Sequence, residues 1–326
     1  MFQNVLSFID KHSSFILTTH EPPDADGIGA QMVLISILKK MGKEFRIINA
    51  APMPKNLLFM DNLNTVEIWD EVKDSASVAN SALMVIDTSD EYHIGSMRET
   101  IKMVKETFIF DHHDPRPKTR LTGFVDPTAA STSELAVELA CSMGVELDSH
   151  TANAAYAGIA YDSGFFAYPK TSIRTFRAAI KTIDWGAQPN NVYRQLMENA
   201  SSAAILLQKQ ALSNLEFYGG RKIAVITLSM EDMEMAGAEY EDAENIVNIP
   251  LKAKEVEVSM LLKEKEKGEI RCSLRSKGKV NVSKIAQEFG GGGHISAAGL
   301  RSSLSMEETL KKLLSSTEAA LLEMRN

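Results

Sequence analysis

Histidines and aspartates form four short clusters in the first half of the chain. In chain order the clusters are His20 with Asp24 and Asp26, then Asp87, then Asp111 with His112 and His113, and finally Asp162. A single aspartate after a strand is usually a turn former or a helix cap, so no cluster alone indicates a functional site. Together, imidazoles and carboxylates without thiolates are typical ligands of Mn²⁺ or Mg²⁺. The set has enough ligands for two ions.

Two ions in one site would suit phosphoryl transfer. Such sites hold their ions about 3.5–4 Å apart, activate water and stabilise the attacking and leaving oxygens. One aspartate that contacts both ions would set that separation. Asp24 and Asp26 are two residues apart in an extended loop, so their side chains project in distinct directions and could each serve one ion. The expected chemistry is hydrolysis of a phosphate ester.

Short apolar runs that alternate with amphipathic segments would position these clusters. This pattern predicts an α/β fold with a parallel sheet covered by helices. Strands are expected at 15–19, 45–49, 82–87 and 107–111, and helices at 28–41, 131–143 and 150–161. The clusters follow strand ends, where open α/β sheets bind ligands. Ser131 and Glu134 have the spacing of a capping box at a helix start.

The second half of the chain has a different pattern. From 173 to 217 it is helical, with a break at Pro189 and no strand signal. Strand patterns return at 222–226, 255–262 and 270–274. We therefore expect three segments: a catalytic parallel-sheet domain at 1–188, a helical connector at 189–219 and a smaller α/β C-terminal domain at 220–326.

Composition limits the classes of partner. Of the 326 residues 44% are hydrophobic, which suits a substantial core, and the net charge of −8 argues against coating long nucleic acid. The apolar runs are too short to span a membrane and no leader pattern opens the chain, so the expected location is cytoplasmic, with no membrane partner. With only Cys141 and Cys272, neither a disulfide framework nor a zinc ribbon is expected.

The ordered motifs resemble the DHH phosphoesterase family. They are His20-Glu-Pro-Pro-Asp24-Ala-Asp26-Gly-Ile-Gly, Asp87 after Leu-Met-Val-Ile, Asp111-His112-His113 and Tyr161-Asp162-Ser-Gly. Residues 289–299, Phe-Gly-Gly-Gly-Gly-His-Ile-Ser-Ala-Ala-Gly, resemble the signature of the DHH-associated domain. Within the family, the length and the two-domain layout are most similar to the bacterial nanoRNase and pAp-phosphatase group.

The resemblance implies a role for each matching residue. Two Mn²⁺ ions would be held, the first by His20, Asp24 and Asp87, and the second by Asp26, Asp87, His112 and Asp162. Asp87 would then bridge the ions, and Mg²⁺ or Co²⁺ could substitute for Mn²⁺. His113 would contact the scissile phosphate or assist its protonation. Asp111 would orient its neighbours rather than bind metal.

A basic, glycine-rich segment follows in the C-terminal part. No acidic residue interrupts five cations between 270 and 284: Arg271, Arg275, Lys277, Lys279 and Lys284. Basic runs are usually solvated surface, but the four glycines that follow allow backbone N–H groups to converge on an anion. The resemblance assigns this region to the substrate's terminal phosphate or its bases. The candidate binding residues are Arg275, Ser276, Gly291, Gly292, Gly293 and His294.

The leading functional hypothesis is a Mn²⁺-dependent phosphoesterase that degrades short oligoribonucleotides (nanoRNA) to mononucleotides and dephosphorylates adenosine 3′,5′-bisphosphate (pAp) to AMP. Its partners would be short single-stranded RNA or nucleotides, and no long duplex. A phosphodiesterase of c-di-AMP, c-di-GMP or linear dinucleotides is the alternative within the same chemistry. A nucleotide-binding regulator with an inactive metal site is the alternative of another class. An inorganic pyrophosphatase is disfavoured, because a nucleotide-sized basic surface would exceed its needs. A homodimer remains open.

Overall fold

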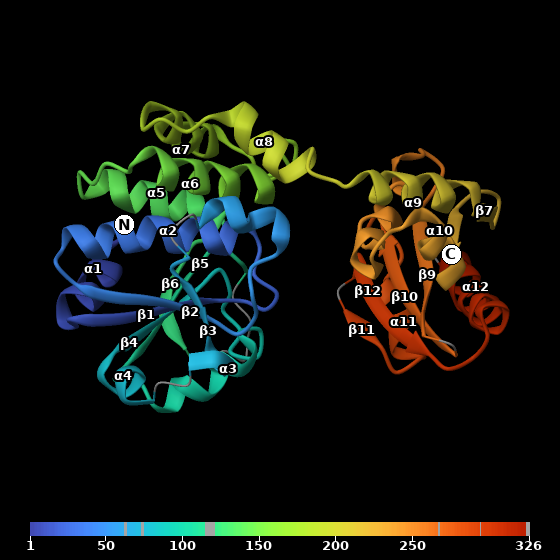
Figure 1. Cartoon of the computed structure of the whole chain (residues 1–326), viewed down its shortest axis with the longest axis horizontal. Helices are drawn as coiled ribbons and strands as arrows, with labels where there is room; N and C mark the ends of the chain where they lie inside the picture. Colours follow the sequence, from blue (N-terminus) through green and yellow to red (C-terminus); the bar gives the residue numbers. More distant parts are fainter. Residues whose placement is uncertain (62–63, 73–74, 115–120, 267, 294, 324–326) are drawn as a thin grey trace. The chain divides into compact units, whose positions relative to one another are not determined.

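The computed structural model describes residues 1–61, 64–72, 75–114, 121–266, 268–293 and 295–323. The chain divides into two compact units, Met1–Asn199 and Ala200–Asn326 (Figure 1). The division falls within the range expected for a helical connector. Helix α8 (Pro189–Met197) belongs to the first unit and α9 (Ser202–Ser213) to the second. Each unit has its own sheet, which confirms the predicted α/β class.

Unit 1 is built on a six-stranded parallel sheet with the strand order β3-β2-β1-β4-β5-β6. The strands are β1 (Ser14–Thr19), β2 (Glu44–Asn49), β3 (Val66–Ile68), β4 (Ala82–Ile86), β5 (Thr107–Asp111) and β6 (Thr122–Val125). The four predicted strands are confirmed, because central parallel strands are buried on both faces and have continuous apolar runs. The sequence pattern missed β3 and β6, which are short, partly exposed edge strands.

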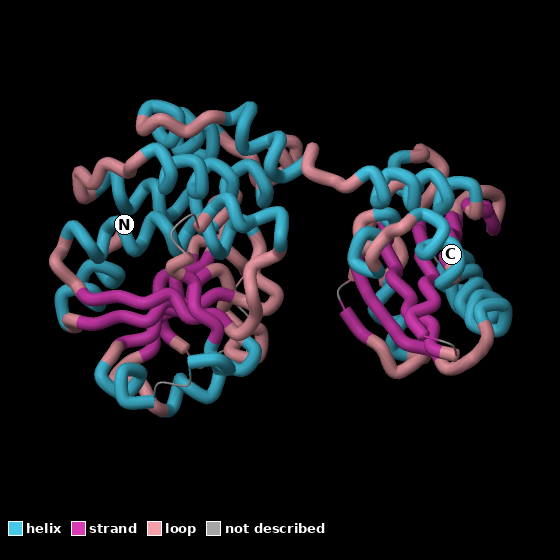
Figure 2. The backbone as a smooth tube through the Cα atoms, viewed as in Figure 1, coloured by secondary structure: helices cyan, strands magenta, loops and turns pink. Residues whose placement is uncertain are grey.

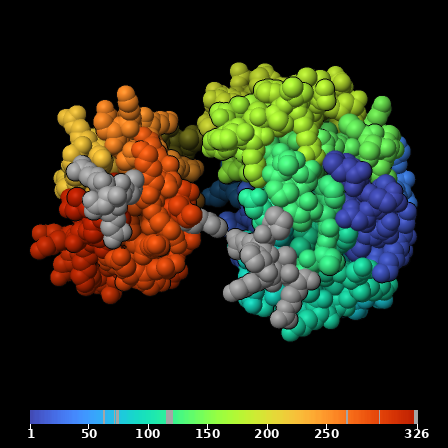
Figure 3. Space-filling model, turned by 180° about the vertical axis from the view of Figure 1, so that it is seen from behind, coloured from blue at the N-terminus to red at the C-terminus, as the bar shows by residue number. Residues whose placement is uncertain are grey.

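Helices cover both faces of the unit 1 sheet (Figure 2). On one face lie α1 (Gln3–Lys11), α2 (Ala25–Lys40), η1 (Lys55–Met60), α5 (Thr132–Ser142) and α6 (Ser149–Asp162). On the other lie α3 (Trp69–Val72), α4 (Ser75–Asn80) and η2 (Gly95–Lys102). Helices α7 (Ile173–Asp184) and α8 pack on α6, and their yellow-green residues lie at the surface of unit 1 (Figure 3). None of the described helices is both long and apolar enough to cross a membrane.

The predicted helices are confirmed, but α2 begins three residues earlier than the pattern indicated. Asp24 caps it, because its Oδ1 accepts hydrogen bonds from the N–H groups of Asp26 and Gly27 at 2.9 and 3.1 Å. At the start of α5, Ser131 Oγ accepts from the Glu134 N–H at 3.0 Å, as the capping motif predicted. Both helices therefore begin beside the end of the sheet that carries the acidic clusters.

Small residues bring three helices of unit 1 unusually close together. A Cβ atom on Gly29 of α2 would lie 2.6 Å from both the Ala154 carbonyl oxygen and Ser133 Oγ. A Cβ atom on Gly158 of α6 would lie 2.1 Å from Ser133 Oγ. Only glycine permits these approaches, so α2, α5 and α6 form one tightly packed layer. This layer fixes the helix ends that carry Asp26 and Asp162.

Unit 2 has a six-stranded mixed sheet with the order β11-β12-β10-β9-β8-β7. Its strands are β7 (Leu215–Tyr218), β8 (Ile223–Leu228), β9 (Val258–Glu266), β10 (Glu269–Ser276), β11 (Gly292–Gly293) and β12 (Ala297–Ser302). Among the described strand pairs of this sheet, only β8 and β9 are parallel. One face packs against α11 (Val282–Gln287) and α12 (Met306–Glu323). The other packs against α9, α10 (Met230–Ala236), η3 (Tyr240–Ala243) and η4 (Ile246–Asn248).

The helical pattern expected up to residue 217 is wrong at its end, where Leu215–Tyr218 form strand β7. This strand lies at the edge of the sheet and pairs antiparallel with β8 through a turn at Gly219 and Gly220, both of which have positive φ. Four partly exposed residues are too few to show a strand period. The pairing, rather than local sequence, determines this strand.

Candidate metal centre

All of the predicted metal ligands converge at the carboxyl edge of the unit 1 sheet. The loops after β1, β4 and β5 supply His20, Asp87 and His112, the start of α2 supplies Asp24 and Asp26, and the end of α6 supplies Asp162. Their ligand atoms form overlapping groups of three, within each of which all atoms lie within 4.8 Å of one another. Such spacing suits coordination of a divalent cation.

The first group contains His20, Asp24 and Asp87. His20 Nε2 lies 3.5 Å from Asp24 Oδ2 and 3.6 Å from Asp87 Oδ2. Asp24 uses its other oxygen to cap α2, so helix formation itself directs Oδ2 toward His20. This carboxylate is therefore held by the backbone before any ion binds.

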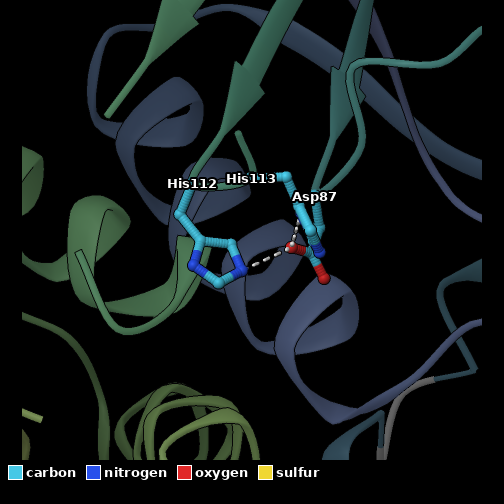
Figure 4. Close-up of side chains that lie close together, drawn as sticks. All are labelled: Asp87, His112 and His113. Carbon is cyan, nitrogen blue, oxygen red and sulfur yellow. Dashed lines mark ion pairs between the residues drawn. The ribbon is translucent and has the colours of Figure 1, made fainter. Parts of the chain in front are cut away.

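The second group contains Asp26, His112 and Asp162. His112 Nε2 lies 3.1 Å from Asp162 Oδ2 and 3.8 Å from Asp26 Oδ2. The same atom lies 3.6 Å from Asp87 Oδ1, and the two side chains point toward one another in Figure 4. Asp87 thus presents one oxygen to each group.

The environment of the His112 ring fits a metal ligand. Nδ1 lies 3.3 Å from the Ala129 carbonyl oxygen, to which it can only donate a hydrogen bond. Nε2 is buried and makes no hydrogen bond of good geometry with the described residues, although Asp162 Oδ2 lies only 3.1 Å away. In the neutral ring the proton is then on Nδ1, and Nε2 carries the lone pair that could bind a metal ion. A metal-binding imidazole usually donates its other N–H to a carbonyl or carboxylate oxygen in this way.

Asp87 has a strained backbone that the surrounding residues stabilise. Its φ of +63° lies in the left-handed region, which costs a residue other than glycine about 1–3 kcal/mol. Its N–H donates to the Phe110 carbonyl oxygen at 3.0 Å, and Thr132 Oγ1 donates to its Oδ1 at 2.8 Å. The strain turns the side chain from the end of β4 toward both ligand groups.

The start of α5 holds Asp26. Its two carboxylate oxygens accept hydrogen bonds from the N–H groups of Thr132 and Ser133 at 2.6 and 2.8 Å. A helix N-terminus favours an anion, because its first N–H groups have no partners within the helix. Neither supporting residue was predicted from the sequence, although the capping motif at Ser131 located the start of this helix.

His113 and Asp111 form a hydrogen-bonded pair beside the ligand groups. His113 Nδ1 lies 2.8 Å from Asp111 Oδ1. The same atom lies 3.7 Å from Asp87 Oδ1 (Figure 4). Asp111 is fully buried and also accepts from Ser89 Oγ at 2.5 Å and from the His112 and His113 N–H groups. The His113 side chain is 55% exposed, so its other nitrogen is available to solvent or substrate.

Crowded charges perturb the acid–base properties of the site. Burial, followed by the charge of Asp87, raises the pKa of Asp26 well above its ordinary value. Burial opposes protonation of His20, but Asp24 and Asp87 outweigh it and raise its pKa to about 11. Burial likewise opposes protonation of His112, whose carboxylate neighbours raise its pKa to about 10. Protons therefore neutralise this cluster when no cation is bound, and bound cations would displace them.

The predicted substrate residues that the structure describes lie in unit 2. Arg275 and Gly291 line a hollow of about 750 Å³. Ser276 Oγ instead donates to the Val280 carbonyl oxygen at 2.7 Å, and Gly292 and Gly293 pair with β12. His294 lies outside the described residues.

Two family matches cover most of the chain. Residues 14–159 match the DHH family, N-terminal domain, and residues 220–323 match the DHHA1 domain. The first match includes the clusters after β1, β4 and β5, and the second includes the glycine run. The order of the motifs along the chain therefore follows the order of the two domains.

Similar proteins extend over nearly the whole chain. A Thermus thermophilus protein named bifunctional oligoribonuclease and PAP phosphatase NrnA is 29% identical over 94% of this chain and 89% of its own length. The cyclic-di-AMP phosphodiesterase GdpP of Bacillus subtilis is 26% identical, over 94% of this chain and 47% of its own length. An exopolyphosphatase-related protein from Bacteroides fragilis has a similar structure, with a TM-score of 0.90, 26% identity and coverage of 100% and 97%. The chain belongs to the DHH family of phosphoesterases and is a hydrolase that acts on phosphoester bonds.

Proposed function

We propose that this enzyme degrades short oligoribonucleotides to mononucleotides and dephosphorylates pAp to AMP. The observation that carries the proposal is the convergence of two ligand groups on Asp87, which faces His20 on one side and His112 on the other. The name of the Thermus thermophilus relative supports the same pair of substrates. The cytoplasmic location and a homodimer stay predictions.

The proposed cofactor is a pair of Mn²⁺ ions, for which Mg²⁺ or Co²⁺ can substitute. His20, Asp24 and Asp87 would hold one ion, and Asp26, Asp87, His112 and Asp162 the other. Bound ions of this kind activate water and stabilise charge on the attacking and leaving oxygens. The carboxylate-rich donor set favours Mn²⁺ over structural zinc.

The residues around the ligands would keep the site in place. Thr132 and the first N–H groups of α5 hold Asp87 and Asp26, so their oxygens stay near the sheet edge. We assign His113 to the scissile phosphate, because its ring is exposed and its Nδ1 is already bonded to Asp111. Asp111 would orient that ring. A histidine placed in this way can donate a hydrogen bond or a proton to a substrate oxygen.

Product analysis with three substrates in parallel tests the proposal. Purified protein in Mn²⁺ is given a 5′-labelled pentaribonucleotide, pAp and c-di-AMP. We expect stepwise shortening of the pentamer and release of AMP from pAp. No cleavage of any substrate in Mn²⁺, Mg²⁺ or Co²⁺ would contradict the proposal and favour a nucleotide-binding regulator.

A phosphodiesterase of cyclic or linear dinucleotides is the second candidate. The similarity to GdpP favours it, because that relative is named a cyclic-di-AMP phosphodiesterase. The same metal ligands would serve either reaction, so the choice depends on the substrate-binding residues of unit 2. Cleavage of c-di-AMP or of a linear dinucleotide alone, with an intact pentamer and intact pAp, would establish this alternative.

A further inference from the structure

The hollow in unit 2 concentrates positive charge. Among the described residues, its lining carries the cations Lys263, Arg271, Arg275 and Arg301 and a single acidic side chain, Glu244. The chain as a whole has a net charge of −8. The surplus of cations is therefore a local feature of this hollow, and it indicates an anionic ligand.

Three of these cations form a row across the sheet, which we call the basic row: Lys263 on β9, Arg271 on β10 and Arg301 on β12. Arg271 is the Cα partner of both Lys263 and Arg301. Neighbouring strands lie about 4.7–4.9 Å apart, so three like charges stand side by side. Like charges directly opposite one another destabilise a sheet, which a polyanion lying across the row would relieve.

The protein neutralises the basic row only in part. Arg271 Nε donates to Glu269 Oε1 at 2.9 Å. The Lys263 Nζ lies 3.9 Å above the Tyr240 ring and 3.3 Å from the Tyr240 carbonyl oxygen, although the residue is only 5% exposed. Neither Lys263 nor Arg301 forms an ion pair with any residue that the structure describes. Burial also lowers the pKa of Lys263, as expected of an incompletely compensated cation.

Arg275 connects the basic row to the proposed substrate site. It lies four residues from Arg271 on the same face of β10, so about 13 Å separates their Cα atoms. Its Nη1 donates only to the Leu274 carbonyl oxygen, and it has no carboxylate partner among the described residues. A stacked nucleic-acid strand advances about 3.4 Å per nucleotide. The distance between Arg275 and the row therefore matches a run of several nucleotides.

We propose that the basic row binds phosphates of a single-stranded oligonucleotide about four nucleotides beyond the one assigned to Arg275, and so selects chains of about five nucleotides over shorter ones. This inference rests on the proposed function, because it takes the oligonucleotide as substrate. A ligand as short as pAp, held at Arg275, does not extend to the row. The row should therefore affect long substrates and leave pAp unaffected.

Binding measured against salt concentration tests the proposal directly. Fluorescence anisotropy of a labelled pentaribonucleotide, in EDTA to prevent cleavage, is compared for the wild type and the double variant Arg271→Ala/Arg301→Ala. Each phosphate contact contributes about 0.7 to the slope of log K against log salt for a single strand. We expect the slope to fall by about 1.4 in the double variant. Lys284→Ala is the matched control, because Lys284 belongs to the same basic segment but does not line the hollow.

Steady-state kinetics provide a second test of the proposal. The double variant should raise KM for the pentamer by about tenfold or more, as expected for lost charge-assisted contacts, and leave kcat/KM for pAp unchanged. An unchanged slope, or an equal loss on pAp and the pentamer, would overturn the proposal. A wild type that cuts neither substrate would contradict the proposed function, while the binding slopes would still decide the role of the row.

A further variant tests the row with a substitution that should leave the protein folded. Lys263→Met removes the buried charge while keeping a long, flexible side chain in the same space. Thermal unfolding should show that it is folded, and the salt slope for the pentamer should fall by about 0.7. A folded Lys263→Met protein with the wild-type slope would exclude Lys263 from the row.

Discussion

The candidate metal centre of unit 1 gathers carboxylates, whereas the hollow of unit 2 gathers cations, and the two sites are built differently. In unit 1 the carboxylates are fixed by helix N-termini, by a strained residue and by buried hydrogen bonds. In unit 2 the cations are aligned by strand register, and much of their charge has no ion-pair partner among the described residues. The comparison suggests a preorganised site for small cations and a looser one for an extended anion. Changes in unit 1 should therefore abolish function, whereas changes in unit 2 should reduce it by degrees.

The largest effect is expected at Asp87. Asp87→Asn removes a carboxylate that lies between the two groups, 3.6 Å from His20 of the first and 3.6 Å from His112 of the second. Loss of several kcal/mol of charge stabilisation corresponds to about a thousandfold fall in kcat. The melting temperature of the metal-free protein should not fall, because a buried negative charge is lost as well. Steady-state assays and thermal unfolding check both points. Asp90→Asn is the control, since Asp90 is in none of the ligand groups; near-wild-type turnover in Asp87→Asn would contradict the account.

Metal affinity should increase with pH. Burial lowers the pKa of His20 and His112, but in the metal-free protein the neighbouring carboxylates outweigh burial and raise the two pKa values to about 11 and about 10. Both rings are therefore protonated at pH 7. Cations must displace these protons, so Mn²⁺ affinity should rise about tenfold per pH unit for each proton released. Calorimetry in buffers of different ionisation enthalpy counts those protons. Binding without proton release between pH 6 and 8 would show that the rings are not ligands.

A smaller effect is expected where the protein only supports a ligand. Thr132→Val removes the hydroxyl that donates to Asp87 Oδ1, and loss of such a supporting hydrogen bond typically reduces metal affinity or activity by about 10–100-fold. Thr132→Ser keeps the hydroxyl and should retain most activity. Mn²⁺ titration of both variants measures the difference. Equal affinity of the two would remove Thr132 from the preorganised site.

The smallest effect is expected in unit 2. Arg275→Ala removes a half-buried guanidinium that has no carboxylate partner among the described residues, so KM for pAp and for the pentamer should rise by about tenfold. We place the chemical step in unit 1, so kcat should change much less. Lys279→Ala is the matched control, because Lys279 pairs with Glu257 outside the hollow. A large fall in kcat without a change in KM would break the contrast between the units.

The convergence of the candidate metal ligands could be predicted from the sequence, because these residues directly follow strands and begin or end helices. The residues that support them could not. Thr132 meets Asp87 across 45 positions of the chain, and the contact depends on how the start of α5 meets the residue that follows β4. The capping motif at Ser131 indicated a helix start, but not which carboxylate that start would hold.

The hollow of unit 2 was less predictable. Arg271 and Arg275 occur in a visible basic run, but Lys263 and Arg301 lie in other strands and reach Arg271 only through the sheet register. A shift of register by one residue would place these side chains on the opposite face. Local sequence does not specify such pairing, as the unpredicted edge strand β7 also shows.

We propose that Asp87 joins two metal ions in one site. Electron paramagnetic resonance of protein loaded with two equivalents of Mn²⁺ tests it directly, because neighbouring Mn²⁺ ions couple magnetically and isolated ions do not. We expect a spin-coupled spectrum from the wild type and its loss in Asp87→Asn. A wild-type spectrum of isolated ions, or saturation at one Mn²⁺ per chain, would contradict the account.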